Sequence, residues 1–181
     1  MIASRMQKKT FNAMKQTTLC YLENDGKYLM LHRTKKQNDI NHDKWIGVGG
    51  KFEEGETPEQ CMLREVFEET GFSVTKWKYR GVVTFYLNES YGETMHLFSC
   101  LEWNGKQKVC DEGDLEWIDK QKLAELPMWE GDKIFLKLVN NLDEPFFNLK
   151  LVYQGEKLIS AEKDGAAILC RCKPLSEGIK I

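Results

Sequence analysis

The sequence has few of the features that mark membrane-spanning, secreted or nucleic-acid-binding proteins. No apolar run approaches the roughly 18 residues of a membrane-spanning helix, and the N-terminal segment has no apolar run of signal-peptide length. Charge of one sign is also lacking, because 26 basic residues face 28 acidic ones, for a net charge of −2. Such a chain has no positive field to hold a polynucleotide. We therefore expect a cytoplasmic protein that binds neither a membrane nor a nucleic-acid polymer.

Histidine is scarce, which limits metal sites built on nitrogen ligands. The chain has three histidines and six cysteines. Cys170 and Cys172 are too close together to form a zinc site without a second pair or nearby histidines. The other cysteines lie among apolar residues, so we predict buried free thiols at these positions, rather than disulfides: Cys20, Cys61, Cys100 and Cys110.

The length and the 41% hydrophobic content fit one compact domain of the α/β or α+β class. We expect a flexible N-terminal extension over residues 1–16, the folded domain over residues 17–163, and a C-terminal tail over residues 164–181. The run from Ala166 to Leu169 in that tail fits either one more edge strand or a dimer contact. A monomer and a homodimer are both compatible with the sequence.

Local patterns predict strands and two helices within the domain. Thr57 can cap a helix, Pro58 suits its first position, Gln60 completes a capping box, and Gly71 is a natural end. The second helix is expected over residues 129–140. Asp25-Gly26 favours a tight turn between the first two strands. The predicted strands cover residues 17–22, 27–32, 73–87, 93–103, 115–118, 146–153 and 157–161.

The first predicted helix carries acid on one side. At about 100° per residue, Glu65, Glu68 and Glu69 share one arc, and an apolar arc with Leu63, Val66 and Phe67 lies nearly opposite. Like charges at this spacing disfavour a helix, and only Arg64 is close enough in sequence to offset them. Carboxylate oxygens on one rigid face suit Mg²⁺, with Mn²⁺ as a possible substitute. The alternative is an ordinary solvated acidic face.

The pattern around these glutamates is more specific than the glutamates alone. Gly50 is followed by five residues, Glu56, seven residues, Arg64-Glu65-Val66, one residue, Glu68-Glu69, one residue and Gly71-Phe72. This pattern resembles the Nudix box. The resemblance implies an α/β/α sandwich with a central mixed β-sheet, and attack of water on a nucleoside diphosphate linked to another group. It also implies site roles: Glu65, Glu68 and Glu69 as metal ligands with the Gly50 carbonyl, and Glu56 and Arg64 as residues that orient the loop and helix.

The flanks of the box resemble the MutT-type 8-oxo-dGTP diphosphatases. Residues 28–33 and 44–51 match the lead-in of that subfamily, and Lys51 is assigned to substrate binding on this likeness. Residues 110–117 resemble the segment that brings an additional glutamate to the metal, here Glu112, as a ligand or general base. The alternative for this segment is a simple polar turn.

Further residues resemble the base pocket of that subfamily. In this reading Trp129 stacks on the purine and Asp132 pairs with its Watson–Crick edge. The same resemblance places the following residues near the base, sugar or phosphates: Thr18, Arg33 and Phe85.

One residue departs from the pattern. A member of the subfamily follows its tryptophan before the box with an asparagine that bonds the base, whereas this chain has Ile46, which cannot form that bond. The resemblance implies Mg²⁺-dependent hydrolysis of oxidised purine nucleoside triphosphates, above all 8-oxo-dGTP to 8-oxo-dGMP and pyrophosphate. The alternatives are a Nudix hydrolase of ADP-ribose, dinucleoside polyphosphates or canonical triphosphates, and a nucleotide-binding module without catalysis.

Overall fold

A computed structural model describes residues 15–35, 39–88 and 91–171 of the chain. The predicted extension lies outside these residues, apart from Lys15 and Gln16, which begin the first strand. Cys172 and the rest of the C-terminal tail beyond Arg171 also lie outside them. No helix in the described ranges is long and apolar enough to cross a membrane.

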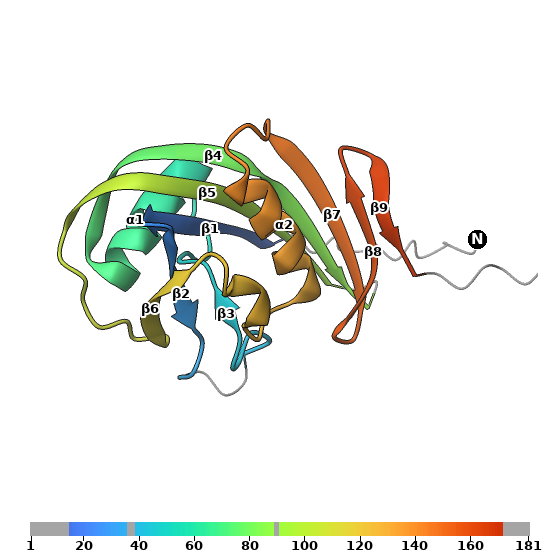
Figure 1. The fold of residues 1–181 in the computed structure, drawn as a ribbon, viewed down its shortest axis with the longest axis horizontal. Coiled ribbons are helices and arrows are strands. Elements are labelled where there is room, and N and C mark those ends of the chain that lie inside the picture. Colours follow the sequence, from blue (N-terminus) through green and yellow to red (C-terminus); the bar gives the residue numbers. More distant parts are fainter. Residues whose placement is uncertain (1–14, 36–38, 89–90, 172–181) are drawn as a thin grey trace, which may run out of the picture.

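The fold is a mixed β-sheet with two helices (Figure 1). The strands are joined in the order β3-β2-β1-β5-β4-β7-β8-β9, and β6 pairs with β2. The pairs β1/β5 and β4/β7 are parallel and the others antiparallel. The bounds are β1 Lys15–Asn24, β2 Lys27–His32, β3 Trp45–Ile46, β4 Phe72–Leu87, β5 Tyr91–Gly105, β6 Asp114–Asp119, β7 Phe147–Gln154, β8 Lys157–Lys163 and β9 Ala166–Cys170, with α1 Pro58–Thr70, a 3-10 turn Leu123–Glu125 and α2 Glu130–Asn140.

Strand β1 is buried on both faces, and this divides the core into two layers. Alternate side chains of a strand point to opposite faces of the sheet. Leu19 and Tyr21 pack with α2 residues such as Phe135, whereas Cys20 and Leu22 belong to the other cluster, with Met62 and Val66 of α1. The two helices therefore cover opposite faces, as the α/β/α sandwich requires.

The ends of α1 agree with the sequence chemistry. The Thr57 hydroxyl accepts the Gln60 N–H at 3.2 Å, and the Gln60 side chain accepts the Thr57 N–H at 2.9 Å. Gly71 ends the helix with a φ of 77°, a conformation that costs glycine little. Because the helix begins and ends at fixed residues, the direction of each glutamate on it is also fixed.

The predicted division of α1 into an apolar face and an acidic face was wrong at two positions. Phe67 is 54% exposed, and its ring lies 5.9 Å from the Lys108 ammonium. Glu69 is only 6% exposed and points into the protein beside the buried Thr70. Glu69 points inward because its carboxylate accepts a hydrogen bond from the buried N–H of Gly49.

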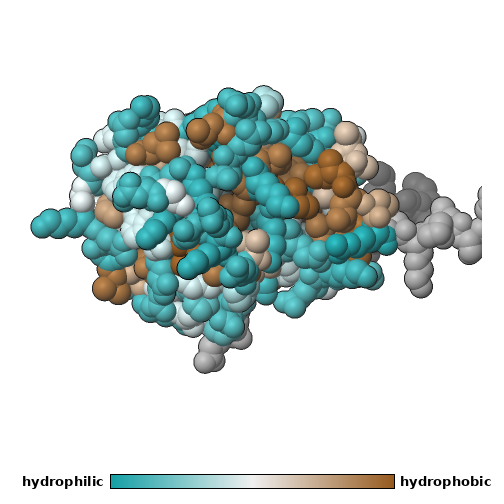
Figure 2. Space-filling view, in the orientation of Figure 1, coloured by the Kyte–Doolittle hydropathy of each residue, from teal (hydrophilic) through white to brown (hydrophobic). Residues whose placement is uncertain are grey.

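The structure also tests the predictions for the cysteines and for the C-terminal run. The four cysteines expected as buried thiols are buried and free. The run Ala166–Cys170 forms the edge strand β9, paired with β8, so the sheet extends beyond residue 163. Strand β3 was not predicted, because two residues are too short to show a period. Figure 2 shows apolar surface gathered around β7 and β8, beside the largely hydrophilic remainder of that face.

Candidate active site

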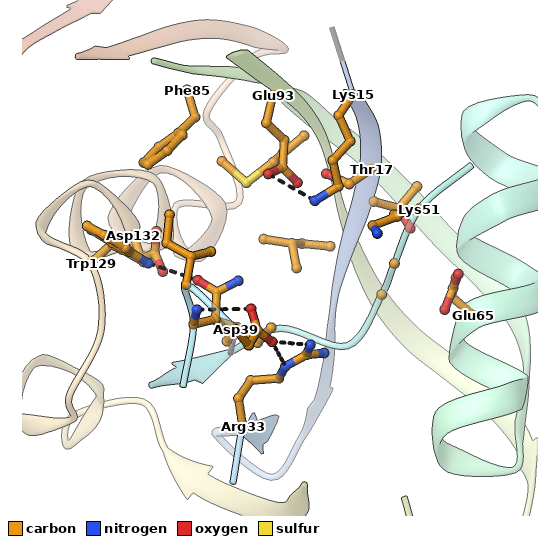
Figure 3. A pocket seen from close by; sticks show the side chains of 18 of the residues that line it. Lys15, Thr17, Arg33, Asp39, Lys51, Glu65, Phe85, Glu93, Trp129 and Asp132 are labelled. Carbon is orange, nitrogen blue, oxygen red and sulfur yellow. Dashed lines mark hydrogen bonds and ion pairs between the residues drawn. The ribbon is translucent and has the colours of Figure 1, made fainter. Parts of the chain in front are cut away.

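A cavity of about 600 Å³ lies between α1 and α2. Figure 3 shows Glu65 of α1 at one side of it and Trp129 and Asp132, at the start of α2, at the other. Strand β1 contributes Thr17, Thr18 and Leu19 to the wall between them. The cavity thus joins the acidic helix α1 to an aromatic end built from distant segments.

Gly50 brings the backbone close to the acidic helix. A Cβ atom at this position would lie 2.4–2.5 Å from the carboxylate atoms of Glu65, so only glycine leaves that carboxylate its place. The Gly50 carbonyl oxygen accepts the Thr18 N–H at 2.8 Å, which holds the loop against β1. The Cys61 thiol also donates to this oxygen, at 3.8 Å, a longer and weaker bond.

Arg64 binds the glutamates on the exposed part of α1. Its guanidinium donates to both carboxylate oxygens of Glu56, at 2.7 and 2.8 Å, to Glu65 at 2.8 Å and to Glu68 at 3.1 Å. It also donates to the Lys51 carbonyl at 3.0 Å, which ties the helix to the preceding loop. The bond to Arg64 lowers the pKa of Glu56 to about 2. Glu56 and Arg64 therefore connect the loop before α1 to the helix.

Glu69 reaches under the glycine loop. Its Oε2 accepts the Gly49 N–H at 2.9 Å, which is the buried donor that draws the side chain inward. Burial, together with the nearby Glu112 and Glu65, raises the pKa of Glu69 to about 8, against the lowering effect of the Gly49 bond. A buried carboxyl among other carboxylates is stabilised by a nearby cation.

Glu112 stands on the opposite wall, where Arg33 binds it. The Arg33 guanidinium donates one N–H to Glu112 and two to Asp39, the Nε bond measuring 3.0 Å. Desolvation acts against the charge of Arg33, and the two carboxylates outweigh it and raise its pKa. Arg33 therefore links the segment after Cys110 to the loop before β3.

The described residues include no group of three or more acidic, histidine or cysteine side chains arranged closely enough to enclose a metal ion. Arg64 and Arg33 bind the carboxylates instead. The donor set is nevertheless all oxygen, and Glu65, Glu68 and Glu112 each perturb a neighbouring carboxyl electrostatically. Hard oxygen donors that repel each other suit Mg²⁺ or Mn²⁺.

The other end of the cavity is aromatic and rigid. Trp129 is 7% exposed and packs edge to face on Phe85, with ring centres 5.7 Å apart. Its indole N–H donates to Asn41 Oδ1 at 2.9 Å, and the Lys44 ammonium lies 4.7 Å from its ring centre. Phe85 of β4 and two residues of the β2–β3 loop therefore fix the plane of Trp129.

Asp132 is a buried carboxyl at this aromatic end. It is 8% exposed and lines the cavity, and the hydrogen bonds found among the described residues leave its carboxyl without a partner. Burial raises the pKa of Asp132 to about 8, against the attraction of Lys44. Burial therefore favours the neutral form of the group, which offers one O–H donor and one carbonyl acceptor.

Most residues that the sequence assigned to the site come together at this cavity. Those that line it are Thr18, Arg33, Gly50, Lys51, Glu65, Phe85, Glu112, Trp129 and Asp132. Glu56, Arg64, Glu68 and Glu69 lie on or behind its α1 wall. Sequence reasoning missed other lining residues, which stand in strands or in a polar loop without periodicity: Lys15, Asp39, Asn41, Glu93 and Met95. The dense Asn and Asp content of residues 38–43 was the one available signal.

The match to known proteins agrees with this geometry. The chain matches the NUDIX domain over residues 14–139 and belongs to the Nudix family, as a hydrolase. Enzymes of this family act on small-molecule nucleotides and generally use divalent metal ions. The family prediction from the sequence is confirmed.

Individual relatives differ in what they are named for. The chain is 31% identical to the oxidized purine nucleoside triphosphate hydrolase of Danio rerio over 153 residues, 82% of this chain and 93% of that protein. It is 26% identical to the CTP pyrophosphohydrolase of Escherichia coli over 121 residues, 66% of this chain and 86% of that protein. The structure of the mutator MutT protein from Bacillus halodurans is similar at a TM-score of 0.73 and 28% identity, covering 83% of this chain and 98% of that one.

Proposed function

We propose that this Nudix hydrolase cleaves oxidised purine nucleoside triphosphates, above all 8-oxo-dGTP, to the monophosphate and pyrophosphate with Mg²⁺. The observation that carries the proposal is the Asp132 carboxyl, buried and without a hydrogen-bond partner among the described residues, beside Trp129 in the cavity. A buried polar group costs free energy unless a partner satisfies it. The edge of a purine, with an acceptor next to a donor, matches a neutral carboxyl.

The phosphate end would hold the divalent ions through Glu65, Glu68 and Glu69, together with the carbonyl oxygen of Gly50. Such ions supply positive charge to the phosphate oxygens and lower the pKa of an attacking water. Glu112 is assigned as a further ligand or as the general base that accepts the proton of that water. Arg33 and Lys51, both at the cavity wall, are assigned to the sugar and phosphates.

The base end would position the purine. Trp129 offers a flat face held by Asn41, Phe85 and Lys44, so that stacking costs little further ordering. Thr18 and Phe85 complete the wall. The Danio rerio relative, whose name specifies oxidised purine triphosphates, supports this assignment.

A substrate panel with Mg²⁺ tests the proposal. We expect the highest kcat/KM for 8-oxo-dGTP among 8-oxo-dGTP, dGTP, CTP, ADP-ribose and a dinucleoside polyphosphate, with pyrophosphate as the second product. If 8-oxo-dGTP has no advantage over dGTP, the oxidised-purine assignment fails. If nucleotides bind but none is cleaved, the protein is a binding module. Glu116→Gln, which changes an exposed glutamate of β6, is the matched control for the carboxylate variants.

A further inference from the structure

Ile46 lines the base end of the cavity and is 7% exposed, but its side chain offers no hydrogen bond. A polar side chain that lines the same cavity comes from a different segment of the chain. Asn41 lies in the loop between β2 and β3, is half-buried, and lines the same cavity. The two positions are five residues apart in the chain, and both line the same cavity as Trp129 and Asp132.

The orientation of the Asn41 amide is fixed by chemistry. The indole N–H of Trp129 can only donate, and it lies 2.9 Å from Asn41, so the atom facing it must be the amide oxygen. The backbone N–H of Asn41 donates to Asp39 Oδ1 at 3.1 Å, which holds the residue in place. The amide nitrogen, Nδ2, therefore occupies the other branch of the group. The dashed line from Trp129 in Figure 3 marks the bond that sets this orientation.

The amide nitrogen has no acceptor within the described part of the chain. The hydrogen bonds found there use the Asn41 oxygen and backbone N–H and none uses Nδ2. A half-buried donor that lines a cavity in a fixed orientation is ready to bind an acceptor of the ligand. Asp39, which lies nearest in the loop, is itself bound by Arg33.

We propose that Asn41 is a specificity-determining residue, which donates a hydrogen bond from Nδ2 to an exocyclic carbonyl oxygen of the bound purine. Asn41 then supplies, from the loop, the polar contact that Ile46 cannot make. Together with the neutral Asp132 carboxyl, the base end presents two donors and one acceptor. That set favours purines that carry a carbonyl oxygen over purines that lack one. The inference rests on the proposed function, because it requires a purine in this cavity.

Arg33 connects the loop that carries Asn41 to the phosphate end of the cavity. Asp39 accepts from Arg33 and from the Asn41 backbone, and Arg33 also donates to Glu112 at the phosphate end. The loop that carries Asn41 is therefore tied to the same arginine as the candidate general base. The backbone of Asn41 is thus connected to Glu112 through the side chains of Asp39 and Arg33.

Binding of monophosphates measures this contact apart from catalysis. We would titrate wild type, Asn41→Asp and Asn41→Ala by calorimetry with dGMP, 8-oxo-dGMP and the 2-aminopurine deoxyribonucleoside monophosphate, which lacks the 6-carbonyl. Asn41→Asp keeps an acceptor for Trp129 but replaces the donor, and Asn41→Ala removes both. Asn104→Asp, at an exposed position of β5, controls for the added charge.

The comparison of 8-oxo-dGMP with dGMP tests the 8-oxygen, and the comparison of dGMP with the 2-aminopurine nucleotide tests the 6-oxygen. In wild type we expect the loss of one of these two oxygens to weaken binding about 10-fold, the usual effect of losing one uncharged hydrogen bond whose partner stays buried. In both Asn41 variants that dependence should disappear. The ligand without the carbonyl should bind Asn41→Asp as it binds wild type, whereas Asn41→Ala, which also removes the acceptor of the Trp129 N–H, should bind all three ligands more weakly. A carbonyl dependence that persists in both folded variants, or is absent from wild type, overturns the role of Asn41. Failure of wild type to bind any of the three ligands overturns the proposed function as well. Melting temperatures confirm that each variant is folded.

Discussion

The two ends of the cavity are built in opposite ways. Most of the phosphate end comes from one stretch of 23 residues, Gly50 to Phe72, where a capped helix follows a glycine loop, and the fold adds Arg33 and Glu112. The base end collects β1, the β2–β3 loop, β4 and the start of α2, and its walls are apolar. A charged site of this kind can be encoded locally because one capped helix fixes the directions of its carboxylates. An apolar wall requires contacts between distant segments.

The largest effect should come from neutralising the phosphate end. Glu69→Gln keeps an oxygen to accept the Gly49 N–H but removes the negative charge, so the fold should persist. We expect kcat to fall by roughly 10²-fold or more, as when a key electrostatic group is removed. Steady-state kinetics with Mg²⁺ measure this, and Glu116→Gln should stay at wild-type activity. Wild-type turnover in both Glu68→Gln and Glu69→Gln would falsify the assignment of these carboxylates.

A pair of glycine variants separates geometry from stability at the same end. In Gly50→Ala the three atoms nearest to the new Cβ belong to the Glu65 carboxylate, the far end of a flexible side chain, so we expect kcat/KM to drop at least about 10-fold with little change in melting temperature. In Gly49→Ala the Cβ would lie 2.1 Å from the Thr18 carbonyl, at a φ of 152°. We expect that variant to lose about 2 kcal/mol or more of unfolding free energy. Equal melting temperatures for the two variants would contradict this structure of the loop.

At the base end we expect Asp132 to make the stability of the protein depend on pH. The pKa of Asp132 is raised to about 8 in the folded protein and returns to its ordinary value near 3.8 on unfolding. The stability contributed by the neutral carboxyl is therefore fully present below pH 4 and is lost as the pH rises through 8. Asp132→Asn should remove this loss, so that its melting temperature exceeds that of wild type increasingly from pH 5 to pH 9. Parallel melting curves at all three of pH 5, 7 and 9 would show that Asp132 is ionised in the fold.

The smallest effect should appear at Phe67, which the sequence pattern placed in the core. Since this side chain is 54% exposed, Phe67→Ser should change the free energy of unfolding by less than about 1 kcal/mol. Val66→Ser, at a fully buried neighbour, should cost several times more. Urea denaturation of both variants measures the contrast, and a large loss for Phe67→Ser would restore the original assignment.

Much of the site could be predicted because its signals are local. Thr57, Gln60 and Gly71 set the ends of α1 through bonds within a few residues, and the resemblance of the box fixed the family. Glu69 and Phe67 show the limit of that reasoning. Helical periodicity describes which residues share a face, but the Gly49 N–H that draws Glu69 inward belongs to a loop 20 residues earlier.

The base end shows the same limit more strongly. Trp129, Asp132 and Phe85 were expected there only through resemblance, and Asn41 was not expected at all. No local pattern around residue 41 indicates a contact with Trp129, because the two residues are 88 positions apart.

The sequence by itself therefore determined the helix, its caps, the glycine loop and the acidic chemistry, because hydrogen bonds and side-chain directions within one helical turn depend on neighbours in the chain. Only the tertiary structure decided the burial of Glu69 and Asp132, the exposure of Phe67 and the orientation of the Asn41 amide. Each of these depends on which distant donor, acceptor or apolar surface the fold brings alongside, and that cannot be read from spacing along the chain.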